Sequence, residues 1–256
     1  MLKKSLSQNL IKDKKILEKM VRLADIAEDD VVVEIGAGQG DFTRAICEKA
    51  GKVFAVELDT SFKDHLESLK RDQPNLRVIF ADVLRVELAR FAEGRKIKVL
   101  GNIPYGITGP ILFKLIEERA SIHSAYLTTQ KEIGQRVVSL SHSRSYGALS
   151  VVCRLVADVK VLLTLKAGLF IPPPKVESTY FSMIFKDKTG HIDRAFMSFV
   201  RRCFENKRKY LRHALLKHYD EDRVAALYKA LSFSPSIRAE EIEPETFVDM
   251  YERLHR

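Results

Sequence analysis

Residues 102–105, Asn-Ile-Pro-Tyr, combine groups that can act together on the amino group of an aromatic ring. Pro104 disfavours the α conformation at Ile103 and so keeps the backbone before it extended. An extended backbone can direct the Asn102 side-chain oxygen and the Ile103 carbonyl at the two N–H bonds of one exocyclic amine. Tyr105 offers a flat face to the ring that carries this amine. The alternative is an ordinary turn, because Asn, Pro and Gly are frequent in loops.

A glycine-containing turn follows the predicted strand at residues 31–35. The run Val-Val-Val-Glu-Ile is almost wholly apolar, as in a buried parallel strand. Gly36 and Gly38 then precede a helical segment at 41–49, and glycines at such a corner let a ligand approach the backbone closely. The spacing is GxGxG rather than the GxGxxG of dinucleotide sites. The shorter pattern is common in class I methyltransferases, in which the loop passes under the amino-acid part of S-adenosylmethionine.

Acidic residues follow the next two predicted strands. Glu57 can accept hydrogen bonds from both hydroxyls of a ribose, whereas we assign the neighbouring Asp59 to a helix cap. Asp82 is placed to accept from an adenine amino group, with Val83 against the ring, although a strand-end Asp often caps a helix instead. Because the carboxyl ends of parallel strands meet at one edge of a sheet, where ligands bind, we expect these groups and Asn102 to converge there.

The elements that must position these residues alternate along the chain and predict an α/β fold. Strands are expected at 31–35, 52–56, 76–80, 97–100 and 124–130, followed by a hairpin of 159–165 and 179–185. From residue 192 the pattern is helical only, with helices expected at 192–205, 207–218, 221–231 and 244–255. We therefore predict a Rossmann-like methyltransferase domain at 1–188 and a small all-helical domain at 189–256.

Residues 170–175, Phe-Ile-Pro-Pro-Pro-Lys, form a stiff connector that cannot be helical. It either serves as a spacer or holds Phe170 rigidly beside the site. Upstream, Ser7-Gln8-Asn9 precedes an amphipathic helix and is either a cap or part of the site.

The net charge of +9 indicates a polyanionic partner, with solvated basic faces as the alternative. Basic residues concentrate in two segments. Residues 1–22 hold seven basic and two acidic residues, and 201–212 hold six basic and one acidic. We expect RNA contacts from Lys3, Lys4, Arg201, Arg202, Lys207, Arg208, Lys209 and Arg212.

The three cysteines, Cys47, Cys153 and Cys203, are widely spaced and form no CxxC pair, so neither a disulfide framework nor a metal site is expected. No apolar run has the length of a membrane span and no signal peptide is recognisable. We expect a cytoplasmic protein with no membrane association.

Nine segments together resemble the KsgA-type (RsmA) rRNA adenine N6,N6-dimethyltransferases. They are SQNLI, VVEIGAGQGDFT, AVELD, AD at 81–82, GNIPY, QKE, YGALSV, FIPPPKVES and NKRKYLRHAL. The resemblance implies a protein that uses S-adenosyl-L-methionine to dimethylate adenosines near the 3′ end of small-subunit (16S) rRNA. It also implies a part in ribosome biogenesis on the pre-30S particle, and we expect a monomer.

By this resemblance, six residues contact S-adenosylmethionine or lie beside its methyl group: Asn9, Ile11, Gly36, Glu57, Asp82 and Asn102. Residues 102–105 would form the catalytic loop, and Phe170 would stack on the target base. Two departures occur: Leu6-Ser7 stands where the family usually has Phe-Gly, and Gly106 where it usually has Asn. Both lean towards the related Erm-type enzymes, which methylate large-subunit (23S) rRNA.

A further alternative is an RNA-binding or ribosome-assembly factor, or a transcription factor, that has kept a methyltransferase fold with little catalysis. A DNA adenine methyltransferase would share the amine chemistry. Its usual tetrapeptide is Asp-Pro-Pro-Tyr, however, and the helical C-terminal domain does not suit it.

Overall fold

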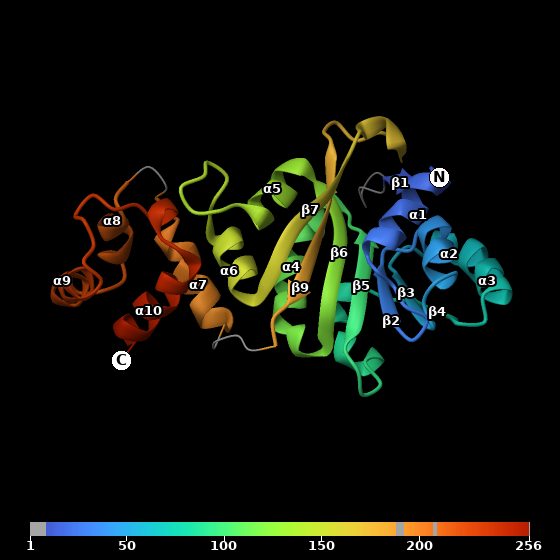
Figure 1. Cartoon of the computed structure of the whole chain (residues 1–256), viewed down its shortest axis with the longest axis horizontal. Helices are drawn as coiled ribbons and strands as arrows, with labels where there is room; N and C mark the ends of the chain where they lie inside the picture. The colour runs from blue at the N-terminus through green and yellow to red at the C-terminus, as the bar shows by residue number, and fades with distance from the viewer. Residues whose placement is uncertain (1–8, 188–191, 207–208, 256) are drawn as a thin grey trace. The chain divides into compact units, whose positions relative to one another are not determined.

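The computed structural model describes residues 9–187, 192–206 and 209–255. The chain divides into two compact units (Figure 1). The first contains residues 1–134 and 160–185, and the second contains 135–159 and 186–256. The domain boundary expected from sequence, at 188/189, placed residues 135–159 with the first domain, whereas the packing groups them with the second unit.

A seven-stranded sheet has the order β4-β3-β2-β5-β6-β9-β7 (Figure 1). Its strands are β2 (Val31–Ile35), β3 (Lys52–Glu57), β4 (Leu76–Phe80), β5 (Ile97–Asn102), β6 (Ile122–Gln130), β7 (Ala157–Leu165) and β9 (Ser178–Phe185). The strands β4, β3, β2, β5 and β6 pair in parallel, and β9 pairs antiparallel with β6. The predicted α/β class and all seven strands are confirmed.

The central strand β2 is buried along its whole length, which explains its continuous apolar sequence. Helices of the first unit are α1 (Lys14–Leu23), α2 (Asp41–Cys47), α3 (Lys63–Asp72), α4 (Thr108–Glu117) and α5 (Lys131–Val138), the last of which crosses into the second unit. Leu17, Met20, Ile46 and Leu66 from these helices are buried in one cluster with strand residues such as Val53. The apolar faces of the helices therefore hold them against the sheet.

A second sheet has two short strands, β1 (Leu10–Ile11) and β8 (Phe170–Ile171). They pair antiparallel, with Ile11 opposite Phe170. This pairing ties the segment before α1 to the proline-containing connector.

The second unit is built from α6 (Ala148–Val156), α7 (Arg194–Cys203), α8 (Leu211–Leu215), α9 (Glu221–Ala230) and α10 (Pro244–His255). Phe196, Phe199 and Phe247 are buried in it, and the buried Tyr146 hydroxyl donates a 2.8 Å hydrogen bond to the Ile242 carbonyl. The helix expected at 207–218 is wrong in length. Among residues 209–218, which the structure describes, the α-helix comprises only Leu211–Leu215, and Tyr210 before it has an extended backbone.

Short 3₁₀ helices complete the connections: Thr60–Phe62, Val83–Arg85, Leu88–Phe91, Tyr105–Ile107, Arg119–Ser121, Ala167–Leu169 and Ala239–Glu241. Within the described ranges, no helix is both long enough and apolar enough to cross a membrane.

Candidate functional site

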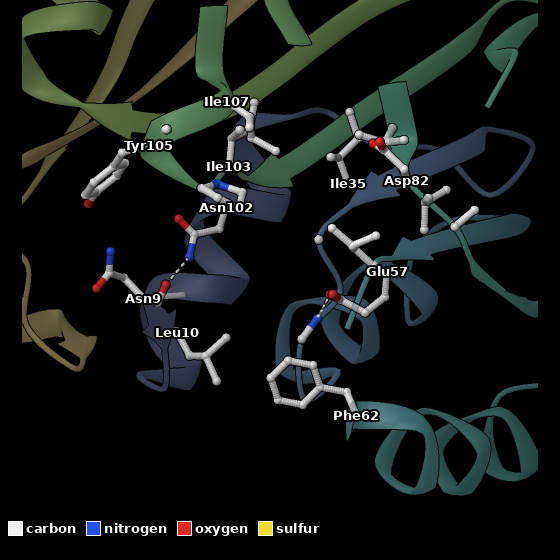
Figure 2. Close-up of a pocket in the computed structure, with 18 residues that line it drawn as sticks. Asn9, Leu10, Ile35, Glu57, Phe62, Asp82, Asn102, Ile103, Tyr105 and Ile107 are labelled. Atoms are coloured by element: carbon white, nitrogen blue, oxygen red, sulfur yellow. Dashed lines mark hydrogen bonds between the residues drawn. The ribbon is translucent and has the colours of Figure 1, made fainter. Parts of the chain in front are cut away.

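A cavity of about 180 Å³ lies at the carboxyl ends of β2, β3, β4 and β5, within the first unit (Figure 2). Its lining includes most of the residues singled out in the sequence: Asn9, Gly36, Gly38, Glu57, Asp82, Val83, Asn102, Ile103, Pro104 and Tyr105. Leu10, Ile35, Phe62 and Ile107 contribute apolar surface. The convergence of strand ends that the sequence predicted is therefore present.

The glycine turn after β2 has a left-handed backbone conformation, which residues with a side chain rarely adopt. Gly36 and Gly38 have φ values of +79° and +55°. A Cβ atom on Gly38 would lie 2.8 Å from Cδ2 of Leu10. Glycine is therefore needed here for two reasons. It permits the left-handed backbone, and at Gly38 it leaves room for Leu10 of the N-terminal segment.

Glu57 is held rigidly at the end of β3. The residue is buried, with only 6% of its surface exposed. One oxygen accepts the Gly38 N–H at 2.8 Å and the other accepts the Asp59 N–H at 2.7 Å. Each carboxylate oxygen keeps a lone pair, so both can still accept hydroxyl protons. Asp59 itself accepts the Ser61 N–H at 3.0 Å, which confirms its assignment as a cap.

Asp82 lines the cavity and also caps the following 3₁₀ helix. Its Oδ1 accepts the Leu84 N–H at 3.0 Å, and Arg85 lies 3.8 Å from Oδ2. Val83 beside it is buried. Asp82 therefore caps a helix, as the alternative interpretation of the sequence expected, and also lines the cavity.

Asn102 ends β5, and its side-chain amide is oriented by the N-terminal segment. Nδ2 donates to the backbone carbonyl of Asn9 at 2.5 Å (Figure 2). The side-chain oxygen points away from Asn9 and has no hydrogen-bond partner among the described residues. Asn102 therefore lines the cavity with its amide nitrogen engaged and its amide oxygen left as an acceptor.

Ile103 and Tyr105 complete this wall. The Ile103 N–H donates to the Thr128 carbonyl at 3.1 Å, and the Ile103 side chain is buried. Tyr105 is half-buried, and its hydroxyl lies 2.7 Å from the Ser178 hydroxyl of β9. Burial raises the pKa of Tyr105, so the phenol stays protonated at neutral pH.

Ile11 and Phe170 do not line this cavity. Phe170 is 1% exposed and packs in the hydrophobic core of the first unit, opposite Ile11 in the β1–β8 pair. Ile11 instead borders a smaller cavity of about 20 Å³ beneath the glycine turn. In this conformation Phe170 offers no free face to a base, so its stacking role stays a prediction that requires the ring to become exposed.

Glu34, which sequence reasoning passed over, borders the same small cavity. Its side chain is 1% exposed, and Oε2 has no hydrogen-bond partner in the structure. Burial raises the pKa of Glu34 to about 8, and the nearby Glu57 charge acts in the same direction. A lone carboxylate inside an apolar strand was the signal that could have identified it.

The basic residues of the second unit lie around α7 and α8. Arg201, Arg202 and Lys209 are exposed. Arg212 is partly engaged, because its guanidinium bonds to Glu221 at 2.7 Å. Lys3, Lys4, Lys207 and Arg208 lie outside the described residues. In the parts of the chain that the structure describes, no cluster of His, Cys, Asp or Glu is arranged to hold a metal ion.

Known proteins resemble this chain over nearly its whole length. A protein named ribosomal RNA small subunit methyltransferase A from Chlorobium phaeobacteroides is 37% identical over 253 residues, which cover 98% of this chain and 93% of that protein. A protein of the same name from Shouchella clausii is 35% identical over 266 residues, covering 99% and 90%.

Solved structures agree with the fold. A dimethyladenosine transferase from Plasmodium falciparum superposes with a TM-score of 0.83 at 25% identity and covers 96% of this chain and 97% of that one. The 23S rRNA methyltransferase ErmE gives a TM-score of 0.72 at 25% identity, covering 97% and 100%. The predicted class I methyltransferase fold is thereby confirmed.

The family model described as ribosomal RNA adenine dimethylase matches residues 1–256, the full chain. The family expected from the nine sequence segments is thus also confirmed. This protein belongs to the ribosomal RNA adenine dimethylase family.

Proposed function

We propose that this protein transfers methyl groups from S-adenosyl-L-methionine to N6 of two adjacent adenosines near the 3′ end of small-subunit (16S) rRNA. As a family member it is an rRNA adenine dimethyltransferase. The observation that carries the proposal is that Asn102, Ile103 and Tyr105 together line the cavity at the strand ends, with the Asn102 amide nitrogen bound to the Asn9 carbonyl.

The residues around the cavity fit S-adenosylmethionine. Glu57 would accept the ribose hydroxyls, and Asp82 with Val83 would hold the adenine ring. The glycine turn leaves room for the amino-acid part. When bound, the cofactor supplies an electrophilic methyl group on a sulfonium centre.

The catalytic loop would activate the adenine amine by orienting it. An exocyclic amine is a poor nucleophile because its lone pair is delocalised into the ring. The Asn102 side-chain oxygen and the Ile103 carbonyl would accept its two N–H bonds and favour a tetrahedral nitrogen whose lone pair faces the methyl group. Such positioning can contribute ~7–11 kcal/mol to lowering a barrier. The alkylated nitrogen is acidic enough to release its proton to water, so no side-chain base is needed.

Tyr105 would stack on the target base after it leaves its helix. Unstacking costs a few kcal/mol, and stacking on an aromatic side chain returns about 1–3 kcal/mol.

The exposed Arg201, Arg202 and Lys209 would bind rRNA phosphates. We further propose that the protein acts as a monomer in the cytoplasm on the pre-30S particle, during small-subunit assembly.

The second candidate is Erm-type methylation of 23S rRNA. It is favoured by the likeness to ErmE, and by Leu6-Ser7 and Gly106. The names of the small-subunit relatives, at 35% and 37% identity, support the first candidate instead.

One experiment separates these candidates. Labelled S-adenosylmethionine is supplied to the protein with undermodified small or large ribosomal subunits, and the modified base is identified. Dimethyladenosine near the 3′ end of 16S rRNA is expected. Label only in 23S rRNA would assign the protein to the Erm type, and absence of label despite cofactor binding would favour an assembly factor.

A further inference from the structure

The orientation of the Tyr105 ring is not determined by its neighbours in sequence. Tyr105 begins a single 3₁₀ turn, Tyr105–Ile107, which has no side-chain cap. Gly106 beside it carries no side chain, and a Cβ atom built there would meet no atom within 4 Å. The ring must therefore be held by a contact from elsewhere in the chain.

That contact is made by Ser178, 73 residues further along. Its Oγ lies 2.7 Å from the Tyr105 hydroxyl oxygen, at the far end of the ring. Ser178 is 0% exposed and is not part of the cavity lining. The hydrogen bond therefore reaches the tip of the ring from a buried residue outside the cavity lining.

Ser178 is itself held firmly in place at the start of β9. It lies opposite Gln130 at the end of β6. The Lys131 N–H donates to the Glu177 carbonyl at 3.0 Å, and the Lys131 ammonium contacts the Glu177 carboxylate at 2.8 Å. The serine hydroxyl thus belongs to a paired strand end and not to a free loop.

The same strand ends hold the backbone of the catalytic loop. The Ile103 N–H bonds to the carbonyl of Thr128, and the Thr108 hydroxyl lies 3.1 Å from that of Thr129. The loop is therefore attached to β6 at both ends and to β9 through the tip of the Tyr105 ring.

We infer that Ser178 is a positioning residue for the target base: its hydroxyl holds the tip of the Tyr105 ring in place, so that a stacked adenine presents its amine to Asn102. This inference rests on the proposed function. Without the hydrogen bond, the side chain can swing about its Cα–Cβ bond, and fewer bound bases have the geometry that attack requires.

The test compares Ser178→Ala, Tyr105→Phe and the double variant in single-turnover methyl transfer to undermodified small subunits. Loss of one neutral hydrogen bond predicts about a 3- to 10-fold slower step in either single variant. The double variant is expected to be no slower than the slower single variant, because both changes remove the same bond. Binding of S-adenosylhomocysteine, measured by calorimetry, is expected to be unchanged.

A second readout follows the ring directly. An RNA fragment with 2-aminopurine at the target adenosine loses fluorescence when that base stacks, and Ser178→Ala is expected to reduce this quenching. Ser182→Ala is the matched control, because Ser182 is a buried serine of the same strand, opposite Tyr126, outside the cavity lining. Ser178→Thr keeps the hydroxyl and is expected to restore part of the methyl-transfer rate. This variant also tests the inference if Ser178→Ala does not fold.

The inference would be overturned by independent, additive losses in the two single variants, by quenching equal to wild type, or by an equal loss in Ser182→Ala. Its failure is distinguishable from failure of the proposed function. Wild-type protein that transfers no methyl group to small subunits refutes the function, whereas active wild type with an equally active Ser178→Ala refutes only the role of Ser178.

Discussion

The side-chain amide of Asn102 donates a 2.5 Å hydrogen bond to the backbone carbonyl of Asn9, which lies 93 residues earlier in the chain. Because the amide nitrogen is engaged in this way, the amide oxygen is the side-chain atom of Asn102 that is left to accept a hydrogen bond at the cavity wall. The N-terminal segment that supplies the carbonyl is in turn held by the β1–β8 pair and by the Lys12–Asp41 ion pair at 2.6 Å. The acceptor is thus oriented before any substrate binds.

Asn102→Ala is expected to slow methyl transfer by about 100-fold or more, as for other preorganised polar groups that act on a developing charge. Cofactor binding should largely survive, because Glu57 and the glycine turn are unchanged. Single-turnover rates and calorimetry with S-adenosylhomocysteine measure the two effects separately. A variant as active as wild type would remove Asn102 from the mechanism.

Asn102→Asp tests the hydrogen bond to the Asn9 carbonyl more specifically than Asn102→Ala does. An aspartate is nearly isosteric but cannot donate to the Asn9 carbonyl, and its charge would face that oxygen. Its methyl transfer should therefore be impaired even though an acceptor oxygen remains. Full activity in Asn102→Asp would show that the Asn9 hydrogen bond is dispensable.

Gly38→Ala should weaken cofactor binding and lower the free energy of unfolding by about 1–2 kcal/mol from the left-handed backbone alone. Crowding adds to this loss, because the new Cβ would lie 2.8 Å from Leu10. Gly94→Ala is the control: its φ is +84°, but nothing lies within 4 Å of its Cβ position. Equal losses in the two variants, measured by urea denaturation, would contradict a role for crowding.

Glu34 makes stability depend on pH. Burial raises its pKa from 4.5 to about 8, so the folded protein retains a proton that the unfolded chain loses above pH 4.5. This contribution to stability is fully present below pH 4.5 and is lost progressively as pH rises towards 8. Glu34→Gln should therefore stabilise the protein more at pH 8 than at pH 5, by urea denaturation. Glu28→Gln, which removes an exposed carboxylate, is the control for loss of one negative charge, and the same pH trend in both variants would contradict the role of Glu34.

Replacing Arg201 or Arg202 by Ala should weaken binding of small-subunit rRNA and reduce the slope of log affinity against log salt by about one each. Arg212→Ala should have a smaller effect, because its guanidinium is already bonded to Glu221. Filter binding at several salt concentrations measures both quantities. A salt slope that does not change in the Arg201 and Arg202 variants would exclude these residues from the RNA contact.

Local sequence determined the sheet and the edge at which the site lies. Apolar runs such as 31–35 identified the strands, and the residues that follow them, Gly36, Glu57, Asp82 and Asn102, meet in one cavity. This was predictable because the carboxyl ends of parallel strands lie at one edge, whatever the details of packing.

Tertiary structure alone decided which side chains of the site are fixed by hydrogen bonds and which are buried away from the cavity. The Asn9–Asn102 and Tyr105–Ser178 hydrogen bonds join residues 93 and 73 positions apart, and nothing in either local pattern encodes these pairs. Pairing of β1 with β8 places Phe170 in the core, and helix packing groups residues 135–159 with the second unit. Such contacts depend on how distant elements pack against one another, whereas spacing along the chain reports only on each element by itself.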